Sequence, residues 1–98
     1  MPSYVVETFL ARGDAGGRAA REERARSTAD ELTREGTHVS FEGSIHVPVD
    51  EMCFFTFDAA SGSEAALVAE RAGLEPLRIV EVIRSEREAT TLTKSLDE

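Results

Sequence analysis

The stretch "THVSFEGSIHVPVDEMCFFTFDA", Thr37 to Ala59, decides the fold. Polar and apolar residues alternate over His38–Val47, which is the pattern of a half-buried strand. The segment "PVDE" then supplies a short connection of four residues. A more apolar strand, "MCFFTFDA" at Met52–Ala59, follows it directly. The stretch therefore predicts a β-hairpin in the middle of the chain.

On the N-terminal side of this hairpin the sequence predicts one strand and one helix. The strand is "SYVVETFL" (Ser3–Leu10), rich in β-branched and aromatic residues. The helix is Arg18–Glu35, with Asp14 as a candidate N-cap and Gly36 as the stop.

On the C-terminal side of the hairpin the sequence predicts a second helix and then a last strand. Ser61 and Glu64 form a capping-box pattern for a second helix that runs to about Ala72. Gly73 is typical of a helix end, and "LRIVEVIR" (Leu77–Arg84) predicts a last strand. The order β-α-β-β-α-β predicts a ferredoxin-like α+β fold, a four-stranded antiparallel sheet with two helices on one face.

The length of 98 residues predicts a single domain. We expect the ferredoxin-like domain at residues 1–84 and a polar C-terminal tail at residues 85–98.

Charge and composition narrow the classes of partner and the location. The net charge of −8 argues against nucleic acid and anionic membranes, which require a basic surface. No apolar run approaches the length of a membrane span. The single cysteine, Cys53, excludes an intrachain disulfide, and the N-terminus lacks the pattern of a signal peptide. We therefore expect a cytoplasmic protein.

The side of the sheet that the helices leave open is predicted from the alternation of side chains along each strand. In the first strand Glu7 is expected on the open face with Val5 and Phe9. In the last strand Val80 and Val82 are expected to point inward. The second strand is expected to turn Val39, Phe41, Gly43, Ile45 and Val47 toward the helices. Its other residues, His38, Ser40, Glu42, Ser44 and His46, are expected on the open face. The same rule places Ile79, Glu81 and Ile83 on the open face.

An open face that mixes carboxylates and imidazoles with apolar side chains is a liability in water. A second copy of the chain pressed face to face would bury it. We therefore expect a homodimer in the form of a dimeric α+β barrel.

The candidate metal ligands are His38, His46 and Cys53. The two histidines are the only ones in the chain, and at about 3.3 Å per residue they lie roughly 26 Å apart along a strand, so they cannot share one ion within a chain. A register that pairs His46 with Cys53 would join an imidazole to a thiol, a pair that suits nickel, zinc or copper. A slip of one residue would instead send Cys53 to the core. Each residue alone also fits an ordinary role, a buried cysteine or an exposed histidine.

The carboxylates Glu7, Glu42 and Glu81 are the candidate polar groups of a ligand cavity. No phosphate loop, nucleophile elbow, HExxH or CxxC pattern occurs, which disfavours the common hydrolase, nucleotide-binding and zinc-finger functions.

Three segments carry a family resemblance: "YVVE", "GSIHVPVDEMCFFTFDA", and "AERAGL" leading into "RIVEV". Over about Tyr4–Arg84 the chain resembles the small ferredoxin-like proteins of the domain of unknown function 4242 family, which includes an actinobacterial nickel-binding protein. The resemblance implies a dimeric α+β fold and binding of nickel or another divalent metal. A tryptophan and a histidine that many members carry before the serine matching Ser44 are Phe41 and Gly43 here, so the resemblance supports the fold and the dimer more than nickel.

Three functions follow as expectations. The first is a homodimer that binds a divalent metal, nickel in particular. The alternative is a small-molecule-binding or enzymatic dimeric barrel, cyclase-like or similar to a cofactor-free monooxygenase. A third, a non-catalytic assembly module, predicts neither a metal nor a cavity. The sequence does not decide whether the protein is an enzyme.

Overall fold

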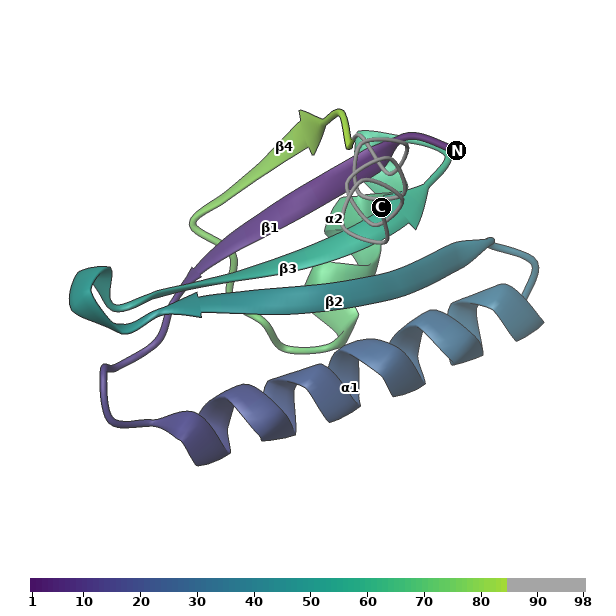
Figure 1. The fold of residues 1–98 in the computed structure, drawn as a ribbon. Coiled ribbons are helices and arrows are strands. Elements are labelled where there is room, and N and C mark those ends of the chain that lie inside the picture. The colour runs from purple at the N-terminus through teal and green to yellow at the C-terminus, as the bar shows by residue number, and fades with distance from the viewer. Residues whose placement is uncertain (85–98) are drawn as a thin grey trace, which may run out of the picture.

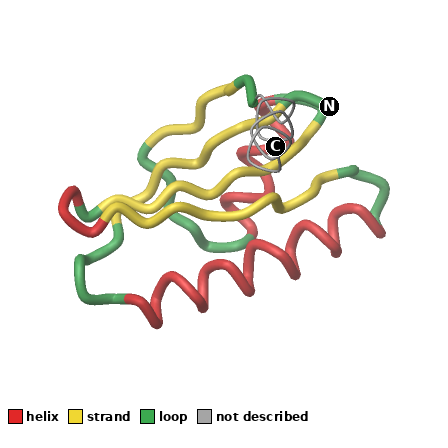
Figure 2. The backbone as a smooth tube through the Cα atoms, in the orientation of Figure 1, coloured by secondary structure: helices red, strands yellow, loops and turns green. Residues whose placement is uncertain are grey.

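The computed structural model describes residues 1–84, so the expected tail at 85–98 lies outside the described residues. The predicted β-α-β-β-α-β order is confirmed (Figure 1). The elements are β1 (Ser3–Phe9), α1 (Ala15–Arg34), β2 (Val39–Val47), β3 (Met52–Ala59), α2 (Gly62–Arg71) and β4 (Arg78–Val82). A short 3-10 helix, Pro48–Asp50, forms the connection between β2 and β3 and is visible as the small coil at the hairpin tip in Figure 2.

The four strands form one antiparallel sheet in the order β2-β3-β1-β4. The central pair, β3 and β1, joins the two halves of the chain, while β2 and β4 are the edges. Helix α1 runs along β2, and α2 packs against β3, β1 and β4 (Figure 1). One face of the sheet is thus covered by helices, as the fold class requires. No helix within residues 1–84 is long and apolar enough to cross a bilayer.

Capping residues set the helix boundaries. The Asp14 carboxylate accepts a hydrogen bond from the Gly17 amide at 2.8 Å, so α1 begins at Ala15, before the expected Arg18. The hydroxyl of Ser61 accepts from the Glu64 amide at 3.3 Å and starts α2. Both N-caps that the sequence indicated are therefore confirmed.

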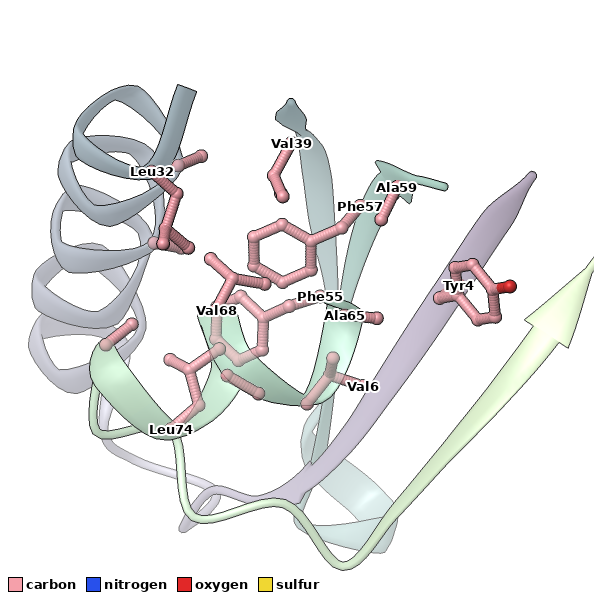
Figure 3. Close-up of a cluster of buried hydrophobic side chains, with 14 of the residues drawn as sticks. Tyr4, Val6, Leu32, Val39, Phe55, Phe57, Ala59, Ala65, Val68 and Leu74 are labelled. Carbon is pink, nitrogen blue, oxygen red and sulfur yellow. The ribbon is translucent and has the colours of Figure 1, made fainter. Parts of the chain in front are cut away.

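The core lies between the sheet and both helices (Figure 3). Phe55 and Phe57 of β3 are fully buried at its centre, between Leu32 of α1 and Val68 of α2. Phe41 of β2 packs against both phenylalanines, with ring centroids 6.3 Å from Phe55 and 5.3 Å from Phe57. Fully burying a side chain of this size contributes about 1.5–3 kcal/mol.

A β-bulge divides β2. The register steps from Phe41 opposite Phe57 to Gly43 opposite Thr56, so Glu42 has no partner on β3. Gly43 takes φ +139°, a conformation that residues with a Cβ rarely adopt. An extra residue in one strand reverses the side-chain faces beyond it.

The bulge makes half of the expected alternation in β2 wrong. Val39 and Phe41 point toward the helices, as predicted. Beyond the bulge, Ser44 lies opposite the buried Phe55 and His46 opposite the buried Cys53, so both are on the helix side. The apolar residues Ile45 and Val47 lie on the open face instead.

The faces predicted for the last strand are also wrong. Val80 lies opposite Val5 on the open face, whereas Ile79 lies opposite the buried Val6 and packs against the core. Glu81 lies opposite the buried Tyr4, on the helix side, and stays exposed at the sheet edge. The cause is that apolar residues stand at both odd and even positions of this strand, so the alternation does not indicate which set faces the core.

The open face is mostly apolar. In β1 the expected placement of Val5, Glu7 and Phe9 is confirmed, because they alternate with buried neighbours. The apolar residues that share this face are Val5, Phe9, Ile45, Val47, Met52, Phe54, Val80 and Val82.

Candidate functional site

A layer of polar side chains separates the first half of α1 from the tip half of the β2–β3 hairpin. We call it the polar layer; its members are Thr8, Arg18, Glu22, Ser44, His46 and Cys53. Thr8, Cys53 and His46 form one row across β1, β3 and β2, because Cys53 pairs with both of the others. Side chains directly opposite in such a row have Cβ atoms about 4.5–5.5 Å apart. Of the two registers that the sequence left open, the structure has the one that pairs His46 with Cys53, yet the pair lies on the helix side of the sheet and Cys53 is in the core.

The composition of α1 explains why polar groups meet at this place. Its buried apolar residues, Ala25, Ala29 and Leu32, all lie in its second half. Arg18 and Glu22 continue the same stripe toward the N-terminus and are half-buried. The sheet residues opposite them are therefore met by charges and not by apolar side chains.

Hydrogen bonds satisfy most of the polar layer. The Ser44 hydroxyl donates to the Glu22 carboxylate, which also pairs with Arg18 at 3.2 Å. The Thr8 hydroxyl donates to the Cys53 carbonyl at 2.9 Å. His46 is the exception, because its Nε2 is buried and has no hydrogen-bond partner among residues 1–84. Such an atom is costly unless a ligand completes its coordination.

Cys53 is a fully buried thiol. Burial raises the pKa of Cys53 above its ordinary value of 9.0, and the nearby Arg18 and Arg21 guanidiniums offset only part of this. The thiol is therefore protonated at neutral pH. The same guanidiniums would favour the thiolate once a cation displaces the proton.

The donor set of His46 and Cys53 suits a soft transition metal, because imidazole nitrogen and thiolate sulfur are ligands for nickel, copper and zinc. Within residues 1–84, no three side chains of His, Cys, Asp or Glu gather closely enough to hold an ion. His38 does not complete the set: it is exposed just before β2 and lines a different hollow. The residues thus supply two protein donors at one place.

The three candidate carboxylates are not brought together. Glu7 lies on the open face and pairs with Arg78 at 2.9 Å. Glu42, in the bulge, accepts from the Ser40 hydroxyl and lies 4.0 Å from Arg84. Since Glu81 lies on the opposite, helix side, these three residues do not line one cavity of a single chain.

Sequence reasoning missed Thr8, Arg18, Glu22 and Ser44 as members of this site. A signal for two of them exists: Arg18, Glu22, Ala25, Ala29 and Leu32 follow one another at spacings of four and three residues. That spacing places Arg18 and Glu22 on the buried stripe of α1 rather than on its solvated side.

Comparison with known proteins supports the fold. No known family profile matches the chain, and no curated protein matches it. The crystal structure of SCO4226 from Streptomyces coelicolor A3(2) is similar, with a TM-score of 0.70 and 17% sequence identity. The match covers 85% of this chain and 98% of that chain. At this identity the likeness establishes a shared ferredoxin-like architecture.

Proposed function

We propose that this protein is a homodimer that binds a divalent transition metal such as nickel, with His46 and Cys53 as its protein ligands. The observation that carries the proposal is the buried Nε2 of His46, which has no hydrogen-bond partner within residues 1–84 and lies beside a buried thiol. A metal ion would give that nitrogen the partner that these residues do not provide.

The surroundings of the pair support this assignment. Arg18 and Arg21 lower the cost of forming a thiolate at Cys53. Glu22, held by the Ser44 hydroxyl two residues from His46, adds negative charge near the cation. Most zinc sites use three or four protein ligands, so two donors predict an exchangeable ion with water in the remaining positions.

The open face supports the dimer. Phe9 is 55% exposed and Ile45 64% exposed, and both belong to the apolar residues of the open face. Soluble monomers rarely expose large contiguous patches of this kind. Packing two such faces together, as sheets pack in a sandwich, would bury them. Glu7 and Arg78 would then bring their ion pair into the interface.

Calorimetric titration of the metal-free protein with nickel tests the metal site. We expect one ion per chain, with a dissociation constant on the order of 1–50 µM. His46→Ala and Cys53→Ser should abolish the binding heat. His38→Ala is the matched control and should retain it, because His38 lies outside the polar layer. The absence of heat in the wild-type protein, or equal loss in the His38 variant, contradicts the proposal.

Sedimentation equilibrium tests the dimer. The wild-type protein should sediment with twice the mass of the chain, and Ile45→Asp should shift it to the monomer. Val49→Asp is the control, because Val49 is 71% exposed but lies in the hairpin turn and not on the open face. A monomeric wild-type protein, or a dimer unaffected by Ile45→Asp, rejects this interface.

A further inference from the structure

A second feature lies at the other half of α1. An open hollow of about 440 Å³ lies where the end of this helix meets the beginning of the edge strand β2. We call it the edge hollow. The side chains that matter for its chemistry are those of Arg26, Asp30, Arg34, His38 and Phe41.

The charge of the edge hollow contrasts with that of the chain. The whole protein carries −8, yet two arginines and a histidine line the hollow against one carboxylate, Asp30. Within residues 1–84, Arg18, Arg71, Arg78 and Arg84 make ion pairs, and the other five arginines make none. Two of these five, Arg26 and Arg34, lie together in the edge hollow.

The Arg26 guanidinium is held in position. It lies over the Phe41 ring, 5.4 Å from the centroid, and the ring itself packs on the core. A guanidinium fixed by its face keeps its N–H edge available for a planar anion.

Helix electrostatics explain only part of this arrangement. Arg34 lies in the last turn of α1, where the helix dipole favours a cation. That effect fades within a turn, so it does not account for Arg26, which lies two turns earlier. His38 lies beyond the helix altogether.

We infer that the edge hollow binds a small organic anion through a phosphate or carboxylate group. Arginine forks recognise both groups by paired, charge-assisted hydrogen bonds. The volume falls in the range of about 300–1,000 Å³ that is typical of small-molecule sites, so it holds more than an inorganic ion. Phe41 supplies an apolar wall for the remainder of the molecule. This site is separate from the polar layer, and its occupation does not depend on the metal.

The test is a titration of the isotopically labelled full chain by ¹H–¹⁵N correlation spectroscopy. The probes are phenyl phosphate, benzoate and inorganic phosphate, in parallel. We expect saturable shifts at residues 26–41, with an organic anion binding more tightly than inorganic phosphate. A preference for phenyl phosphate identifies a phosphate ester as the ligand class, and a preference for benzoate identifies a carboxylic acid.

Arg34→Gln should weaken binding about tenfold, the loss expected for one charge-assisted contact. Arg12→Gln removes the same charge from an exposed arginine outside the hollow and should leave binding unchanged. Unshifted, dispersed amide signals elsewhere confirm that each variant is folded. The inference is overturned by the absence of saturable shifts up to about 20 mM of every probe. Equal losses in the two variants overturn it as well, because they would reveal nonspecific attraction.

Discussion

Replacing His46 by leucine should stabilise the metal-free protein. The substitution removes the buried Nε2, which has no hydrogen-bond partner in the described part of the chain, and fills the space with an apolar side chain of similar size. Removing a functional group normally costs stability. Here the sign is reversed, because residues 1–84 leave this group without a hydrogen bond.

The magnitude follows from the cost of an unsatisfied buried polar atom, about 1–3 kcal/mol. His46 is partly exposed as a whole residue, which places the expected gain in the lower half, about 1–2 kcal/mol. For a domain of this size, 1 kcal/mol corresponds to about 4–8 °C in Tm. We therefore expect Tm of the variant to rise by roughly 4–16 °C.

Urea denaturation followed by circular dichroism, with a chelator present, measures the difference. His38→Leu is the matched control and should stay within about 0.5 kcal/mol of wild type, because His38 is exposed. With nickel at a hundredfold excess over its dissociation constant, the wild-type protein should gain about 2.7 kcal/mol and the variant nothing. The stability order of the two proteins should then reverse.

A loss of more than about 1 kcal/mol in metal-free His46→Leu would refute this reasoning. It would mean that Nε2 makes a favourable interaction in the folded protein, for instance with an ordered water in the polar layer. The argument for a metal at this place would then lose its basis.

Three further substitutions probe the local structure. Gly43→Val should lower the free energy of unfolding in urea by about 1–3 kcal/mol, and the cost is backbone strain, because φ is +139° and an added Cβ meets no neighbour. Gly13→Val, in an exposed loop, should lower it by less than about 0.5 kcal/mol. Equal losses in the two variants would contradict this. Because the pKa of Cys53 in the folded protein is raised above 9.0, the protonated thiol contributes its full stability below pH 9.0, and this contribution is lost as pH rises through the folded-state pKa. Urea denaturation at a series of pH values above 9.0 should therefore show a fall in the free energy of unfolding that Cys53→Ala lacks. Parallel pH curves for the two proteins would rule this out. Ser61→Ala should cost about 1 kcal/mol through the lost N-cap, while Ser63→Ala in the same turn should not.

The order and type of the elements could be predicted because each element carries its own local signals. Asp14 and Ser61 mark helix starts, and Gly73 takes the left-handed conformation, φ +69°, that a helix end requires. The hairpin itself followed from its two strand patterns and short connection, but its register stayed open, so the sequence did not decide whether His46 and Cys53 are paired.

The faces of β2 could not be predicted from alternation, because alternation assumes that every residue of the strand pairs with one residue of its neighbour. Glu42 has no partner on β3, so each residue after it points to the face opposite to the predicted one. Gly43 was the available signal, because a glycine inside a strand often marks a bulge. The polar layer depends on that reversal and on the helix stripe together. No single segment therefore reveals it.

The divided stripe of α1 has a consequence for amide exchange. Its second half is anchored by Ala25, Ala29 and Leu32, whereas hydrogen bonds from Ser44 to Glu22 and from Arg21 to the Phe9 carbonyl hold its first half to the sheet. Few buried apolar contacts mean a low free energy of local opening. Amides of residues 18–23 should therefore exchange with deuterium sooner than those of residues 25–34. Because Glu22 in this half of the helix is bonded to Ser44, two residues from His46, its opening would give an ion a route to the imidazole while the core stays intact.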